Sequence, residues 1–106
     1  LLKKLKKKNK KIVGYGAAAK GNTLLNYCKI NNTLIDVIVD ISPSKQNKYM
    51  PGSHIKIKDL NYLKKNNIDY LLILPWNIKN EIIKQNNFLL KKGTKVILPI
   101  PKVNVI

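Results

Sequence analysis

The segment Gly14-Tyr15-Gly16-Ala17-Ala18-Ala19 holds the residues best suited to binding a phosphate. It fits the pattern G-x-G-x-x-G/A and lies between an apolar segment and a segment with helical periodicity. Glycines allow a tight turn and close approach of the backbone, and N–H groups at a helix N-terminus bind anions. Asp40 follows 24 residues after Gly16, roughly where a dinucleotide site places its ribose-binding acid. The pattern predicts a phosphate cradle; the alternative is a glycine pair that only packs helix on sheet.

Lys20 strengthens this interpretation because it falls in the first turn of the helix that follows the glycines. A cation there opposes the helix dipole at a cost of about 0.3–1 kcal/mol. A bound anion would offset that cost, so we expect Lys20 to contact a pyrophosphate, with Asn22 and Thr23 near enough to add hydrogen bonds. The alternative is an ordinary surface lysine in a lysine-rich chain.

Four further residues have side chains that suit a nucleotide. Lys45 and Tyr49 lie in segment 41–54, which is long for a connector without helical pattern and which could supply phosphate and stacking contacts. That segment could equally be a simple connector. Trp76 would stack on a ligand or cover the sheet, and Asn77 would offer its amide.

Nothing in the sequence predicts a metal centre or a catalytic pair. Cys28 is the only cysteine and His54 the only histidine, which excludes an internal disulfide and a multi-cysteine zinc site. No Ser–His–Asp or paired-carboxylate arrangement stands out. Cys28 shares the apolar face of the predicted helix, so we expect a buried core thiol.

Short apolar segments alternate with helical ones. We expect strands at 11–16, 34–40, 54–57, 69–75 and 94–100, and helices at 17–30, 59–67 and 77–90, the last ended by Gly93. This alternation predicts an α/β fold: a doubly wound, Rossmann-like, five-stranded parallel sheet in the order 3-2-1-4-5, with helices on both faces. The ligand crevice then lies at the carboxyl ends of strands 1 and 4, where the glycine turn faces segment 75–77.

Composition fits one globular domain, with 44% hydrophobic and 25% charged residues. The chain begins at Leu1, so we expect a piece of a longer protein, with 1–10 a helix tail or linker from a missing upstream domain and 11–106 the Rossmann-like domain. The longest apolar run, Tyr70–Trp76, is far below the roughly 20 residues of a bilayer span. No signal peptide is evident either, so we expect a cytoplasmic protein without a membrane partner.

The net charge of +16 would suggest a nucleic-acid partner, but every basic residue is lysine. Lys, Ile and Asn, which have AT-rich codons, account for 50 of the 106 residues, so the basicity can reflect genome composition. Base readout favours arginine, and we therefore expect no nucleic-acid partner. A positive field would still attract phosphates.

The chain resembles a known family over nearly its whole length, from about Asn9 to the end. The segment Lys11–Cys28 looks like the opening of the C-terminal domain of S-adenosylmethionine-dependent sugar C-methyltransferases. Later blocks agree in order: Val39-Asp40, Ser44-Lys45-Gln46, Pro51-Gly52-Ser53-His54-Ile55, Asp69-Tyr70, Leu74-Pro75-Trp76-Asn77, Glu81-Ile82-Ile83 and Pro99-Ile100-Pro101.

The resemblance implies a three-part enzyme. A zinc-binding region and a methyltransferase domain, which holds S-adenosylmethionine and the catalytic base, would precede this domain. The reaction implied is deprotonation next to a sugar ketone, followed by methyl transfer to that carbon. This domain would bind no cofactor and would hold the nucleoside diphosphate of a deoxysugar. The substrate contacts expected in it are Gly14, Tyr15, Gly16, Lys20, Asn22, Asp40, Lys45, Tyr49, Trp76 and Asn77.

Two other functions stay open from the sequence. A free-standing dinucleotide- or coenzyme-binding Rossmann module, such as a small redox-sensing domain, predicts binding of NAD(H). A basic interaction domain predicts nucleic-acid affinity that falls steeply with salt. The methyltransferase interpretation predicts a nucleoside-diphosphate ligand and no preference for nicotinamide.

Overall fold

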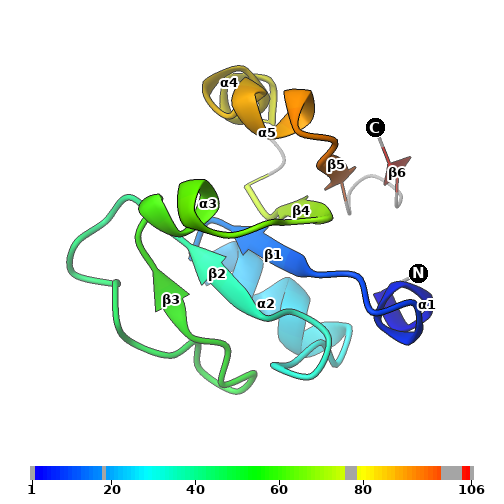
Figure 1. The fold of residues 1–106 in the computed structure, drawn as a ribbon. Helices are drawn as coiled ribbons and strands as arrows, with labels where there is room; N and C mark the ends of the chain where they lie inside the picture. Colours follow the sequence, from blue (N-terminus) through cyan, green and yellow to red (C-terminus); the bar gives the residue numbers. More distant parts are fainter. Residues whose placement is uncertain (1, 18, 76–78, 99–103, 106) are drawn as a thin grey trace.

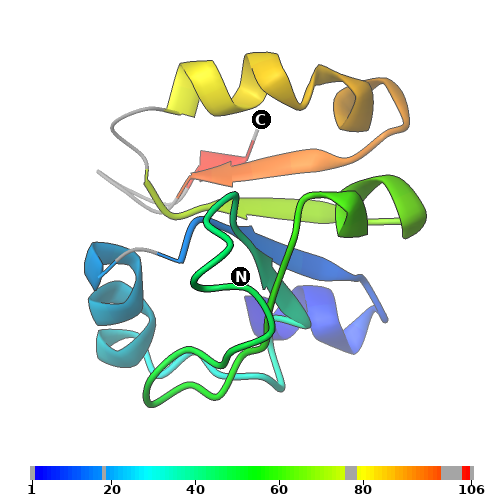
Figure 2. The same ribbon diagram turned by 90° about the vertical axis from the view of Figure 1, so that its left-hand side faces the viewer.

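Helices cover both faces of one sheet in the computed structural model, which describes residues 2–17, 19–75, 79–98 and 104–105 (Figures 1 and 2). In chain order the elements are α1 (Leu2–Lys7), β1 (Ile12–Tyr15), α2 (Ala19–Tyr27), β2 (Val37–Val39), β3 (Ile57–Lys58), α3 (Asn61–Lys65), β4 (Tyr70–Ile73), α4 (Lys79–Gln85), α5 (Asn87–Lys91), β5 (Lys95–Leu98) and β6 (Asn104–Val105). Figure 2 shows α1 and α2 on one face and α3, α4 and α5 on the other.

The strand order is β3-β2-β1-β4-β5-β6, which confirms the predicted order 3-2-1-4-5. All pairs within the first five strands are parallel, and Gly14 of β1 lies between Ile38 of β2 and Leu72 of β4. The two-residue strand β6 adds an antiparallel neighbour to β5 that the sequence pattern did not predict. The order reverses at β1 and β4, as the prediction required.

Alternate strand residues face opposite layers, which divides the core in two. In β4, Tyr70 and Leu72 pack toward α1 and α2, whereas Leu71 and Ile73 pack toward α3, α4 and α5. Strands β1, β2 and β5 contribute to both clusters in the same way, because side chains of a strand alternate with period two. A sheet covered on both faces explains why β1, β2 and β4 contain no charged residue.

Cys28 is exposed, so the prediction of a buried thiol is wrong. The reason is that α2 stops at Tyr27 in a Schellman motif instead of continuing to residue 30. The N–H of Ile30 donates to Leu25 O at 2.8 Å, and Lys29 takes a φ of 56° between them. Ile30 folds back onto the core next to Leu25, and Cys28 faces solvent.

The helix predicted over 77–90 is two short helices, α4 and α5, that break at Asn86. This asparagine is buried, and its side-chain Nδ2 donates to Ile82 O at 2.9 Å. The predicted stop at Gly93 is confirmed, because Gly93 has a φ of 99° and the N–H of Thr94 donates to Leu89 O at 3.0 Å.

Helix α1 packs on the same face as α2. Leu5 is buried in the cluster that holds Ile12, and Lys6 Nζ lies 3.2 Å from Asp36 Oδ2. The residues before β1 therefore contribute to this core, and the boundary between residues 10 and 11 stays a prediction.

The long connection 41–54 contains no helix or strand, as expected, yet it is held against β3. The N–H of Asn47 donates to Ile57 O at 2.8 Å, and the N–H of Ile57 donates to Lys48 O at 2.8 Å. The connection thus runs antiparallel to β3, from the carboxyl edge of the sheet toward its amino edge. No helix in the described part of the chain is long and apolar enough to cross a bilayer.

Candidate functional site

The glycine turn lies at the carboxyl end of β1, against the ends of both neighbouring strands. The N–H of Gly16 donates to Val39 O at 2.8 Å, and a Cβ on Gly16 would lie 2.7 Å from Pro75 Cδ. Its φ of 95° also favours glycine. Pro75 follows β4, so the turn and the first residue of segment 75–77 meet as predicted. Trp76 and Asn77 lie outside the described residues.

Asp40 fastens this turn to the end of β2. Its Oδ2 accepts a hydrogen bond from the N–H of Ala17 at 2.6 Å, and its Oδ1 accepts one from the N–H of Ser42 at 2.7 Å. Gln46 Nε2 donates to the main-chain oxygen of Asp40 at 3.0 Å. A carboxylate offers about four acceptor positions, so capacity remains for a ligand hydroxyl or N–H.

Helix α2 begins at Ala19, so Lys20 lies in its first turn, where the sequence placed it. That turn contains no acidic residue. Asn22 and Thr23 follow within the same helix. The predicted phosphate cradle and Lys20 therefore lie at the end of β1, in the turn after it and in the first part of α2, where the strand order reverses.

Three other predicted contacts lie in different surroundings. Tyr15 is buried and packs toward α3, α4 and α5, so its ring belongs to the core. Lys45 lies in the turn that follows Asp40, with its N–H donating to Ser42 O at 3.1 Å. Tyr49 is 59% exposed and lies opposite Lys56, the residue before β3, whose Nζ is 5.8 Å from the tyrosine ring centroid. The structure does not bring Tyr49 to the glycine turn, because the connection has by then run away from the carboxyl edge.

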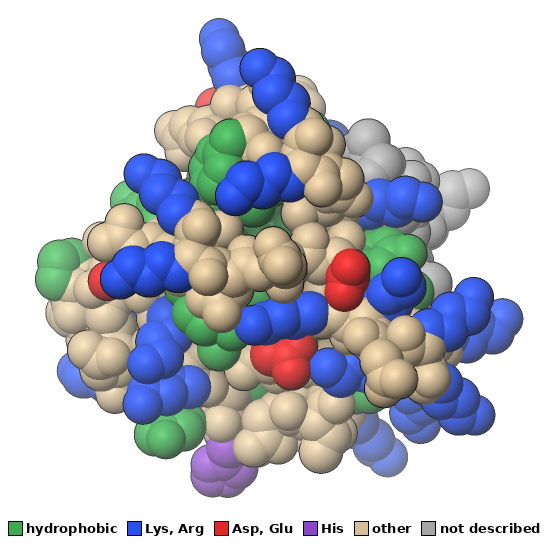
Figure 3. Space-filling view, viewed as in Figure 1, with side chains coloured by type: hydrophobic (Ala, Val, Ile, Leu, Met, Phe, Trp, Pro, Cys, Tyr) green, Lys and Arg blue, Asp and Glu red, His purple; other side chains and the backbone are tan. Residues whose placement is uncertain are grey.

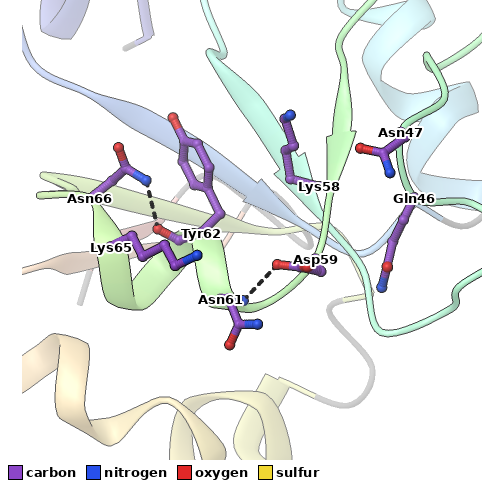
Figure 4. Close-up of a pocket in the computed structure, with 8 residues that line it drawn as sticks. All are labelled: Gln46, Asn47, Lys58, Asp59, Asn61, Tyr62, Lys65 and Asn66. Atoms are coloured by element: carbon purple, nitrogen blue, oxygen red, sulfur yellow. Dashed lines mark hydrogen bonds between the residues drawn. The ribbon is translucent and has the colours of Figure 1, made fainter.

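A polar groove of about 290 Å³ beside the carboxyl end of β3 was not found from the sequence (Figure 4). Its lining comes from the connection after β2, the end of β3 and helix α3, namely Gln46, Asn47, Lys58, Asp59, Asn61, Tyr62, Lys65 and Asn66. Asp59 follows β3 directly, and its Oδ1 accepts the N–H of Asn61 at 3.0 Å. The lining residues share no spacing in the sequence, and only Lys58 and Asp59, which follow the strand predicted at 54–57, could have indicated the groove.

All four aspartates accept hydrogen bonds from backbone N–H groups. Besides Asp40 and Asp59, Asp36 Oδ2 accepts the N–H of Ile12 at 3.2 Å and Asp69 Oδ2 accepts the N–H of Lys11 at 2.7 Å. Among the described residues no three His, Cys, Asp or Glu side chains group as metal ligands would. Figure 3 shows lysines spread over the whole of one face with few acidic side chains among them. The positive charge is therefore spread over this face, and each aspartate accepts at least one hydrogen bond that orders the backbone.

These features define the class of the molecule: a doubly wound, Rossmann-like α/β domain with a glycine turn at its switch point. The sequence profile described as "C-methyltransferase C-terminal domain" matches residues 1–101. The chain is also 38% identical over 97 residues to the C-methyltransferase NovU of Streptomyces niveus. That alignment covers 92% of this chain and 23% of NovU. The chain belongs to the C-methyltransferase C-terminal domain family.

Solved structures agree on the fold. UDP-D-quinovosamine 4-dehydrogenase from Vibrio fischeri superposes with a TM-score of 0.60 at 25% identity, over 88% of this chain and 79% of that one. A Rex-family repressor, RSP, superposes with a TM-score of 0.57 at 21% identity, over 93% of this chain and 51% of that one. The second likeness shows the fold alone.

Proposed function

We propose that this chain is the substrate-binding domain of an S-adenosylmethionine-dependent sugar C-methyltransferase, and that it holds the nucleoside diphosphate of a deoxysugar. Membership of the C-methyltransferase family supports the parent reaction. NovU, which is named for that activity, is about four times as long as the matched region, so one domain would supply only part of the machinery. The named substrate of the Vibrio dehydrogenase, which shares this fold, is a UDP-sugar.

The observation that carries the proposal is the assembly after β1. Gly16 brings the backbone close to the crevice, and α2 starts three residues later with Lys20 in its first turn. N–H groups at the start of a helix and a nearby ammonium act on the same anion, so a pyrophosphate would be attracted by both. Asp40, which already orders the turn through Ala17, would accept a hydrogen bond from a ribose or base donor.

We place the chemistry of methyl transfer in the remainder of the protein. A base next to the sugar ketone, the methyl donor and a structural zinc would all be bound there. The described residues of this chain do not fit a zinc site, since they hold no suitable group of three ligands. The role left for this chain is to fix the nucleotide, and with it the sugar, against the methyltransferase domain.

Calorimetric titration of the chain distinguishes the three functions. We expect saturable 1:1 binding of uridine diphosphate at 0.15 M salt, and weaker binding of NADH. Tighter binding of NADH than of uridine diphosphate would favour a dinucleotide-binding module instead. Affinity for DNA or RNA that falls steeply with salt, with no competition by uridine diphosphate, would favour a nucleic-acid-binding domain.

We expect the 106-residue chain alone to transfer no methyl group. Its four aspartates are bonded to backbone N–H groups, and His54 is an exposed residue of the connection before β3. A general base must lie within hydrogen-bond reach of the proton that it removes, held there by neighbouring groups. Incubation with a keto-deoxysugar nucleotide and methyl-labelled S-adenosylmethionine measures this, and labelled sugar above background would contradict it.

A further inference from the structure

The groove between α3 and the connection after β2 has the chemistry of a hydrogen-bonding site. Among the described residues, the side chains of Asn47, Asn61, Lys58 and Lys65 have no hydrogen-bond partner. Each asparagine amide offers both a donor and an acceptor, whereas each lysine only donates. Figure 4 shows the connection on one side of the groove and α3 on the other, with Lys58 and Asp59 between them.

Asp40 joins this groove to the glycine turn. Its carboxylate accepts the N–H of Ala17 in the turn, and its own N–H donates to Lys58 O at 3.0 Å. Gln46, which lines the groove, donates to its main-chain oxygen. The end of β3 lies two strand spacings from the end of β1, which is about 10 Å at roughly 4.8 Å for each spacing. One extended nucleotide can reach from the turn to the groove.

We propose that the groove holds the base of the nucleoside diphosphate, with its pyrophosphate at the glycine turn; this inference rests on the function proposed above. The amides of Asn47 and Asn61 hydrogen-bond the edge of the base. A purine or pyrimidine edge presents donors and acceptors side by side, and an amide can match both. Lys11 Nζ already lies 4.9 Å from the ring centroid of Tyr62, so recognition is assigned to the amides and not to stacking on this ring.

Two substitutions remove the amides while they preserve the backbone. Asn47 has a φ of 64°, which glycine tolerates, so Asn47→Gly is suitable. Asn61 is the first residue of α3, and the backbone N–H that Asp59 accepts is retained in Asn61→Ala. Asn87→Ala is the matched control, because Asn87 is also the exposed first residue of a five-residue helix and does not line the groove.

The test is calorimetric titration of each variant with uridine diphosphate and with inorganic pyrophosphate. We expect Asn47→Gly and Asn61→Ala each to weaken uridine diphosphate binding by about three- to tenfold, the effect of one lost hydrogen bond, and to leave pyrophosphate binding unchanged. Asn87→Ala should change neither affinity. Urea unfolding of all three variants should show that the fold is kept.

The outcomes separate the two proposals. Unchanged uridine diphosphate affinity in both variants would overturn the groove as the base site and leave the proposed function standing. An equal loss for uridine diphosphate and pyrophosphate would also overturn it, because the side chains would then act on charge or on the turn. If the unmodified chain binds neither ligand, the proposed function fails, and the groove proposal fails with it.

Discussion

Replacing Lys20 with alanine should weaken nucleoside-diphosphate binding by about ten- to a hundredfold. A charge-assisted hydrogen bond to phosphate contributes roughly 1.5–3 kcal/mol, and each 1.4 kcal/mol is a factor of ten in affinity. The stability of the empty domain should stay the same or rise by a few tenths of a kcal/mol, because a cation in the first turn of α2 opposes the helix dipole. Titration with uridine diphosphate and urea unfolding measure the two effects.

Lys7→Ala is the control for Lys20→Ala. Lys7 is the exposed last residue of α1, which precedes β1 and so lies toward the opposite edge of the sheet (Figure 1). At physiological salt the Debye length is about 8 Å, so this lysine should contribute little. Equal losses in the two variants would mean diffuse attraction by a chain of net charge +16. Unchanged affinity together with lower stability in Lys20→Ala would make Lys20 a structural residue.

Replacing Gly16 with alanine should lower the free energy of unfolding by about 3–5 kcal/mol. The new Cβ meets the ring of Pro75 at 2.7 Å, and the residue must also adopt a φ of 95°. Backbone strain of this kind costs about 1–3 kcal/mol, and overpacking costs a similar amount. For a domain of this size the melting temperature should fall by at least about 12 °C.

Gly93→Ala separates the two causes of that loss. Gly93 has nearly the same φ, 99°, but nothing lies within 4 Å of its added Cβ. It should therefore show only the backbone strain, about 1–2 kcal/mol. The excess in Gly16→Ala then measures the contact with Pro75. If the two variants lose equal stability, the glycine turn is not packed tightly against the end of β4.

The fold could be predicted because its signals are local and repeated. Neighbouring residues alone indicate the apolar strands, the helical periodicity of the segments between them and the helix end at Gly93. The rule that crossovers are right-handed then determines the strand order. The errors have local causes too. A Schellman motif at Lys29 ended α2 early and exposed Cys28, and the side chain of Asn86 accompanies a break in the last helical segment. The left-handed residue after α2 is a lysine, so no glycine marked the stop.

The site was less predictable, because it depends on contacts between distant segments. The sequence placed the glycine turn and Asp40 together because both follow neighbouring strands. It also expected Tyr49 near the ligand, and the pairing of residues 47 and 48 with Ile57 carries that tyrosine away. The groove is lined by three segments, the connection after β2, the end of β3 and α3, that have no common spacing in the sequence, so only the folded structure shows it.

The pairing of the long connection with β3 also bears on how copies of this chain behave at high concentration. The outward N–H and C=O groups of Ile57 are both bonded within the chain. An outermost strand with free backbone groups is a template for strand addition, which starts many aggregates. Residues 47 and 48 already form hydrogen bonds with the outward backbone groups of Ile57. A second molecule therefore cannot add a strand at β3 unless the connection first detaches. Together with the repulsion between chains of net charge +16, this protects the domain from polymerising through that edge.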